Sequence, residues 1–270
     1  MKFEQVEKKI QNPPAAHNVA RLLDPESETK TTLNIARFAV SIPSFNYLVA
    51  DAMIKDRVSL KLELDTAVAA TRTKGSPAGR DQNEALVRAF FAYDEVRGYS
   101  EARVVDPYKG SFRISRSIKV PTSSTFVILE HGKQVPVVIC GWKSFSLNRE
   151  QIRVWVSMLD SGLFSFADYL DAPWEIVLFP EQDTSEGGIR FPKIIRPGDY
   201  AVMRPSDLAE LSAMYARAQK AAMPIAREMW EKRERARKEK EAPRVEVPLP
   251  FDPPAHGDLF ADRPDSSLDE

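Results

Sequence analysis

Four β-like segments follow one another in the middle of the chain and constrain its fold more than any other feature. They are rich in β-branched and aromatic residues, as strands are, and cover Ala102–Val105, Phe112–Val120, Thr125–Glu130 and Val135–Trp142. The tripeptide His131-Gly132-Lys133 predicts a tight hairpin between the last two. A further strand is expected at Trp174–Phe179, and a β segment over Ile189–Met203 that bends at Pro197-Gly198. The pattern predicts an α+β protein with a mixed or antiparallel sheet and helices packed against it.

Helical periodicity is clearest over Asn148–Asp160, where apolar residues recur on one face. Asp81 and Glu84 form a capping-box pattern that begins a helix ending near Gly98. Other helices are expected near the N-terminus, from a cap at Ser44 to about Lys55, over Ser165–Leu170, and, capped by Ser206, from Asp207 to about Glu241. Pro224 lies inside this last helix, so we expect a kink there or two shorter helices.

Two segments between these helices carry other signals. From Val58 to Asp65, apolar residues alternate strictly with polar ones, which predicts a half-buried strand. Thr73–Arg80 contains two glycines and a proline, which predicts the most flexible internal loop.

The chain divides into three parts by composition. Residues 1–29 are polar and interrupted by prolines, as expected of an N-terminal extension, and residues 30–241 are expected to form a single domain. Residues 242–270 are rich in proline and aspartate and are predicted to be a disordered acidic tail. The tail has seven acidic residues against two arginines, a balance of -5, so the rest of this chain of net charge -1 carries +4.

Composition also excludes several classes of site. A single cysteine, Cys140, rules out an internal disulfide and a multi-cysteine zinc site, and the three histidines lie in different regions. No stretch is apolar enough for a signal peptide or a transmembrane helix. We therefore predict a cytoplasmic protein with no metal, no cofactor and no membrane partner.

The stretch from Thr125 to Leu159 combines two hairpin-linked strands with Lys143, a short loop and a helix carrying Gln151 and Trp155. This arrangement resembles the core of the restriction-endonuclease-like superfamily, particularly its RecB-type branch. The resemblance implies that Glu130 matches the acid of the first strand and Lys143 the lysine of an acid-x-lysine triplet. Gln151 and Trp155 would then match the glutamine and the aromatic residue of the helix.

The triplet departs from this family at its acid, because the sequence reads Gly141-Trp142-Lys143. Such nucleases need two carboxylates to hold Mg²⁺. The resemblance therefore implies an inactivated relative that binds nucleic acid without cutting it, and no catalytic residue is assigned. A purely structural interpretation stays open, in which Trp142 packs against Trp155 and Lys143 is a surface cation.

The segment Phe112–Val120 carries a second signal. Taken as one strand, it places Arg113 and Lys119 on a basic face with two serines, which could contact phosphates or simply face solvent. Arg116 falls on the apolar face and would need a carboxylate such as Glu130 or Glu175, or a bound anion. The predicted nucleic-acid-binding residues are Arg113, Arg116, Lys119 and Lys143.

The tail contains His256-Gly257-Asp258-Leu259-Phe260, which is similar to the sliding-clamp-binding peptide of bacterial replication and repair proteins. Asp258, Leu259 and Phe260 match that peptide. The similarity implies docking on a clamp through two adjacent apolar side chains.

These signals favour a non-catalytic accessory protein of nucleic-acid metabolism or of a mobile element, which binds DNA, RNA or a replication partner. One alternative is a metal-dependent nuclease whose missing acid comes from elsewhere, for example Glu150 or Asp160. The other alternative is an adaptor that binds only proteins.

Overall fold

The computed structural model describes residues 2–184 and 187–241 and confirms an α+β fold. The chain forms one compact unit up to Glu231, and Lys232 begins a second, of which the residues through Glu241 continue helix α8. The predicted disordered tail, with its clamp-like peptide, lies outside the described residues.

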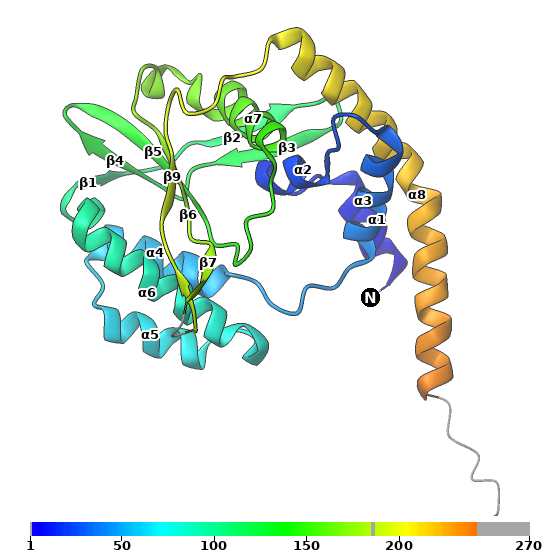
Figure 1. The fold of residues 1–270 in the computed structure, drawn as a ribbon, viewed down its shortest axis with the longest axis horizontal. Helices are drawn as coiled ribbons and strands as arrows, with labels where there is room; N and C mark the ends of the chain where they lie inside the picture. The colour runs from blue at the N-terminus through cyan, green and yellow to red at the C-terminus, as the bar shows by residue number, and fades with distance from the viewer. Residues whose placement is uncertain (1, 185–186, 242–270) are drawn as a thin grey trace, which may run out of the picture. The chain divides into compact units, whose positions relative to one another are not determined.

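A five-stranded mixed sheet lies at the centre of the first unit, with the strand order β1-β4-β5-β6-β9 (Figure 1). All neighbouring strands are antiparallel except β5 and β6. The strands are β1 (Arg103–Val105), β4 (Phe126–Glu130), β5 (Lys133–Cys140), β6 (Glu175–Leu178) and β9 (Lys193–Ile195). His131 and Gly132 both have positive φ between β4 and β5, as a two-residue hairpin turn requires, so the predicted hairpin is confirmed.

Helices cover both faces of this sheet, because the side chains of its strands alternate between two hydrophobic clusters. Val135, Val137 and Ile139 of β5 pack with α4, α5 and α6. Val138 and Cys140 pack in the other cluster, with α1, α2, α3, α7 and α8. The helices are α1 (Phe3–Gln11), α2 (Ala16–Leu22), α3 (Glu28–Val40), α4 (Leu48–Leu60), α5 (Leu64–Thr73), α6 (Arg80–Arg97), α7 (Arg149–Leu159) and α8 (Pro205–Glu241).

Two small antiparallel ribbons and four short helical turns complete the described structure. The ribbons pair β2 (Lys109–Arg113) with β3 (Lys119–Ser123), and β7 (Glu181–Thr184) with β8 (Gly187–Arg190). The turns are η1 (Pro77–Gly79), η2 (Tyr99–Glu101), η3 (Asp160–Phe164) and η4 (Ala167–Tyr169).

The N-terminal segment 1–29, expected to be an extension, belongs to the packed unit instead. Helices α1 and α2 bury Val6, Ile10 and Val19 in the main cluster, and Gln219 of α8 donates a hydrogen bond to the carbonyl of Ile10. Pro13 and Pro14 lie in the short connection between these two helices.

The predicted strand from Val58 to Asp65 is wrong. Helix α4 continues to Leu60, Lys61 adopts a left-handed conformation that ends it, and α5 begins at Leu64. The alternation misled because it crosses a helix boundary: Val58 is buried, whereas Leu60 is 73% exposed. The start of α4 is also later than predicted, after Tyr47 rather than at Ser44.

Two further boundaries differ from the sequence prediction. Helix α6 follows directly from the turn η1, so its N-cap is Gly79 and not Asp81. Glu84 does not close a capping box there, because its carboxylate binds Arg72 and Arg88. Helix α8 runs through Pro224 as one element.

Candidate functional site

The nuclease-like residues do not meet at one place. Glu130 ends β4, beside the first residue of β5, and its carboxylate accepts two hydrogen bonds from Arg97. Lys143 follows the other end of β5 and pairs with Glu181 at 2.8 Å. Because β5 has eight residues, at about 3.3 Å per residue the two side chains start roughly 25 Å apart or more. They cannot share a metal ion.

The other members of that pattern have structural partners. Gln151 completes a capping box with Asn148, and its amide donates to the carbonyls of Arg21 and Leu23. Trp155 is fully buried. The ring of His17 lies between it and Trp142, with centroid distances of 5.8 and 5.1 Å.

The missing acid of the triplet also has a steric explanation. A Cβ atom at Gly141 would lie 2.4 Å from Cδ2 of Leu86, so an acidic residue there would require the Leu86 side chain to shift. The alternative acids are Glu150, which pairs with Arg153, and Asp160, at the end of α7. Within residues 2–184 and 187–241, no three His, Cys, Asp or Glu side chains are placed to hold a metal ion.

The predicted basic strand is a hairpin. Ile114 and Ser115 both donate their backbone N–H to the carbonyl of Ile118, which turns the chain between β2 and β3. Arg116 therefore lies exposed at the turn rather than on a buried apolar face. The carboxylates of Glu130 and Glu175, proposed as its partners, are bound by Arg97.

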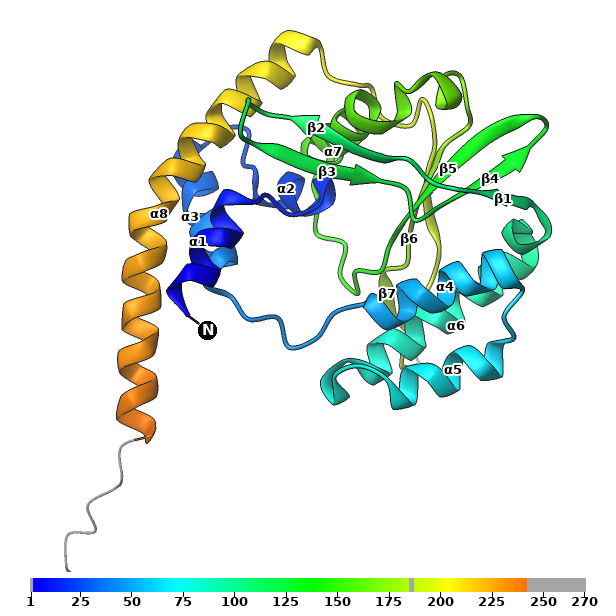
Figure 2. The same cartoon turned by 180° about the vertical axis from the view of Figure 1, so that it is seen from behind.

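We call β2 and β3, together with their turn, the basic ribbon. Phe112 and Val120 are buried on one face, while the opposite face is exposed (Figure 2). Its four cations are Lys109, Arg113, Arg116 and Lys119. All four are exposed, and none forms an ion pair within the described part of the chain. No acidic residue occurs between Asp106 and Glu130.

The root of the basic ribbon is held tightly against the turn after α7. A Cβ at Gly110 would lie 2.1 Å from the carbonyl oxygen of Gly162, so only glycine permits this approach. Thr122 Oγ1 donates to the same carbonyl at 2.9 Å. The ribbon is thus fixed at its root, with the turn at Arg116 at its far end.

A cavity of about 210 Å³, here called the polar cavity, opens beside this root. Elements far apart in sequence form its wall: the start of α2, the first turns of α4, the chain from β3 into β4, the end of β5, and α7. The polar residues of the wall are His17, Asp51, Lys55, Thr122, Ser123, Ser124 and Thr125. The cavity lies near the carboxyl end of β5, where that strand runs parallel to β6, the end at which α/β sheets bind ligands.

Two titratable groups of this cavity are strongly perturbed. Burial lowers the pKa of His17 from 6.5 to about 4, with a smaller contribution from Arg21, so the ring is neutral at pH 7. The amide of Asn18 donates to Nε2 of this ring, which leaves the ring proton on Nδ1. Burial raises the pKa of Asp51 to about 6, against the opposing effect of Lys55. Such perturbed groups concentrate at functional sites.

The hydroxyl groups of the cavity differ in their hydrogen bonding. Thr125 Oγ1 accepts from the backbone N–H of Ile139, and Thr122 bonds Gly162. Ser124 is only 6% exposed, and its hydroxyl has no partner in the described structure. Buried polar groups are nearly always bonded, so the Ser124 hydroxyl points to a missing partner.

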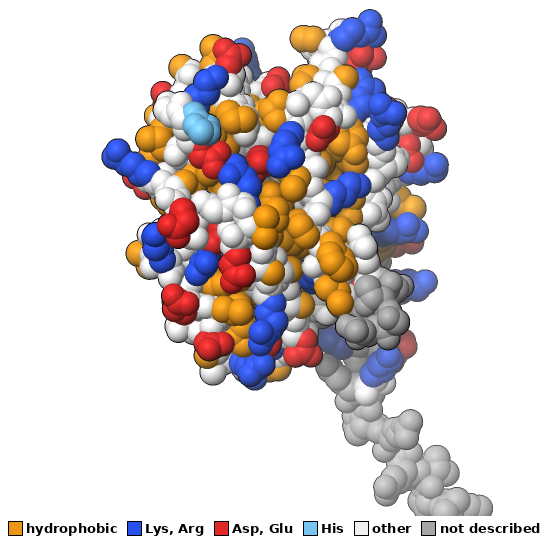
Figure 3. Space-filling model, turned by 60° about the vertical axis from the view of Figure 1, so that its left-hand side comes forward, with side chains coloured by type: hydrophobic (Ala, Val, Ile, Leu, Met, Phe, Trp, Pro, Cys, Tyr) orange, Lys and Arg blue, Asp and Glu red, His pale blue; other side chains and the backbone are white. Residues whose placement is uncertain are grey.

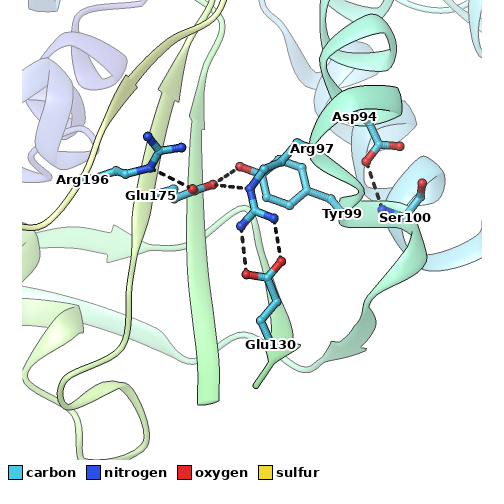
Figure 4. Close-up of polar contacts among 7 residues, drawn as sticks. All are labelled: Asp94, Arg97, Tyr99, Ser100, Glu130, Glu175 and Arg196. Carbon is cyan, nitrogen blue, oxygen red and sulfur yellow. Dashed lines mark hydrogen bonds and ion pairs between the residues drawn. The ribbon is translucent and has the colours of Figure 1, made fainter. Parts of the chain in front are cut away.

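A second buried polar cluster, here called the charged network, joins α6 to the sheet (Figure 4). The Glu175 carboxylate accepts hydrogen bonds from Tyr99, Arg97 and Arg196. Arg97 also binds Glu130 in a bidentate pair, with distances of 2.6 and 2.9 Å, and this lowers the pKa of Glu130. The charged side chains of this network bind one another, so we interpret the network as a structural element that holds α6 against the sheet.

An apolar hollow of about 620 Å³ lies between α6 and β8. Its wall includes the exposed side chains of Val96, Ile189 and Phe191. Hydrophobic side chains gather in the middle of the face shown in Figure 3. The wall of the hollow has few polar groups that could orient a ligand, so it does not indicate which chemical class of ligand would bind there.

Sequence reasoning missed the polar cavity and the charged network. It placed a buried arginine at position 116, whereas the buried guanidinium is Arg190, which donates to Gly141, Phe179, Tyr47 and Gln82.

None of the described helices is long and apolar enough to cross a bilayer.

Comparison with known proteins adds no assignment. No protein-family model, curated protein or solved structure matches this chain.

Proposed function

We propose that this chain is a non-catalytic accessory protein that binds nucleic acid through the basic ribbon. One observation carries the proposal: Arg113 and Lys119 are directly opposite one another in the ribbon register. Like charges at such positions destabilise an antiparallel pair. Among the residues that the structure describes, neither cation forms an ion pair with a carboxylate. A polyanion that binds across both strands would supply the missing negative charge.

The dimensions of the basic ribbon suit this role. Two-stranded ribbons fit the major groove of DNA, and exposed arginine and lysine side chains bind phosphates in any nucleic acid. Lys109 and Arg113 are four residues apart on β2 and therefore lie on the same face of the strand. Arg116, at the turn, extends this row of cations. Lys143 is not part of this row, because it follows the carboxyl end of β5 and pairs with Glu181.

A salt titration tests the proposal. Fluorescence anisotropy of labelled single- and double-stranded DNA should show affinity that falls as salt rises. Replacing Lys109, Arg113, Arg116 and Lys119 together by glutamine should flatten the slope of log affinity against log salt by about 0.7–0.9 per cation. The bound DNA should stay uncut in Mg²⁺.

A charge-matched control separates the ribbon from general electrostatics. Lys30, Lys61, Arg204 and Arg217 are exposed cations that each pair with a carboxylate, and their replacement by glutamine changes net charge by the same amount. This variant should keep most of the slope. Absence of wild-type binding at low salt, or equal losses in both variants, would overturn the proposal.

A further inference from the structure

The polar cavity and the basic ribbon are parts of one surface. Ser123, at the root of β3, lines the cavity and lies opposite Lys109 in the ribbon register. A nucleic-acid strand held by Lys109 therefore passes the mouth of the cavity. The cavity can receive a part of that strand.

The polar atoms of the cavity wall that have no hydrogen-bond partner among the described residues indicate which ligands the cavity can bind. The Asp51 carboxylate receives no hydrogen bond from the described residues, and the Ser124 hydroxyl is also unpartnered. Carboxylate oxygens only accept hydrogen bonds, whereas a serine hydroxyl both donates and accepts. A fitting ligand thus offers N–H donors to Asp51 and at least one further polar atom to Ser124.

Charge argues against a phosphate in this cavity. Asp51 would repel an anion, and the single Lys55 offsets only that one carboxylate. His17 adds no positive charge, since its ring is neutral at pH 7. A metal ion is equally ill suited, because Asp51 is the only carboxylate in the wall. A neutral polar ligand remains.

Size and wall composition narrow the class further. About 210 Å³ is below the roughly 300–1,000 Å³ of drug-sized sites, so one or two rings fit. Trp155, Ile139 and Leu159 supply an apolar wall beside the polar one. Planar rings with a polar edge match this combination, and unstacked bases are recognised through that edge and through stacking.

We propose that the polar cavity binds a single unstacked nucleobase, with guanine preferred. Guanine presents two adjacent N–H donors, on N1 and N2, that match the two oxygens of the Asp51 carboxylate, and its acceptors can meet Ser124. This inference rests on the proposed function, because the basic ribbon brings the strand to the cavity. It is tested separately with free nucleosides, which do not need the ribbon.

Isothermal titration with guanosine and inosine is the direct experiment. Inosine lacks the N2 amino group and keeps N1–H, so it should bind the full-length protein on the order of tenfold more weakly, as loss of one hydrogen bond to a charged group predicts. Asp51→Asn should weaken guanosine binding at least tenfold and remove the preference over inosine. Ser124→Ala should also weaken guanosine binding.

Three controls keep the outcomes distinct. Asp56→Asn, on α4 but outside the cavity wall, should bind guanosine like wild type. The fourfold ribbon variant should also bind guanosine unchanged, while Asp51→Asn should keep the salt slope of DNA binding. Circular dichroism confirms that each variant is folded.

Three results would overturn the nucleobase site. They are no guanosine binding at millimolar concentration, equal affinity for inosine, or unchanged affinity in both Asp51→Asn and Ser124→Ala. Guanosine binding without any DNA binding would instead overturn the function of the ribbon alone.

Discussion

The charged network and the polar cavity both bury ionisable groups, but they treat them in opposite ways. Glu175 has a side chain only 5% exposed and accepts hydrogen bonds from three donors. Asp51 is buried enough for its pKa to rise to about 6 and accepts none from the described residues. The first carboxylate is saturated by the protein, and the second is left open.

This difference separates structure from function. A buried carboxylate whose partners are all supplied by the chain stabilises the packing of the elements that carry those partners. A buried carboxylate or hydroxyl without partners lowers the stability of the fold, so its presence beside a cavity favours a role in binding. Substitutions should therefore change stability with opposite signs at the two places.

The largest effect is expected at Glu175. Glu175→Gln removes the charge that Arg97 and Arg196 share and should lower the free energy of unfolding by about 3 kcal/mol. That is the low end of the usual 3–5 kcal/mol for breaking a buried pair, because Arg97 keeps Glu130. Urea unfolding measures the change.

Lys61→Gln is the matched comparison, because it breaks an exposed pair with Glu101 and should cost at most about 1 kcal/mol. If the two substitutions cost the same, the charged network does not hold α6 against the sheet.

The next effect has the opposite sign and depends on pH. A raised pKa in the folded state means that the protein is most stable with Asp51 protonated, and that this stability is lost as pH rises from about 4 through 6. Asp51→Asn removes the loss and should stabilise the protein by roughly 2–3 kcal/mol at pH 7. Thermal unfolding at pH 4 and 7 should show a gain only at the higher pH. If the variant is less stable than wild type at pH 7, the Asp51 carboxylate must have a stabilising partner within the protein, which contradicts this interpretation.

The strands show which parts of the fold can be predicted from the sequence and which cannot. β4 and β5 were predicted because richness in β-branched and aromatic residues and a two-residue turn are local signals, and the structure confirms both the strands and the turn. The helix pair around Lys61 was mistaken for a strand because local alternation does not show which tertiary surface a residue meets. The turn at Arg116 was missed because no glycine or proline marks it. Instead, the Ser115 hydroxyl accepts a hydrogen bond from the backbone N–H of Ile118 and also contacts the hydroxyl of Ser117.

The sites depend on contacts that no local pattern contains. Arg97 and Glu175 are 78 positions apart in sequence, and the cavity wall draws on α2, α4, β3, β5 and α7. The sequence did single out Arg113 and Lys119, because both fall in one β-like segment. It could not show that they would oppose each other across a ribbon, nor that Lys143 would pair elsewhere.

The smallest effect compares two hydroxyl groups within a few residues of each other. Ser124→Ala deletes a buried hydroxyl without a partner and should raise the free energy of unfolding by about 1 kcal/mol, the lower range for an unsatisfied buried group. Thr122→Val deletes a hydroxyl that donates to the carbonyl of Gly162, so the loss of this hydrogen bond should lower stability by about the same amount. Both are measured by urea unfolding at one pH. Destabilisation by Ser124→Ala would show that its hydroxyl is bonded within the protein, and the cavity would then lose one of the two groups that define its ligand.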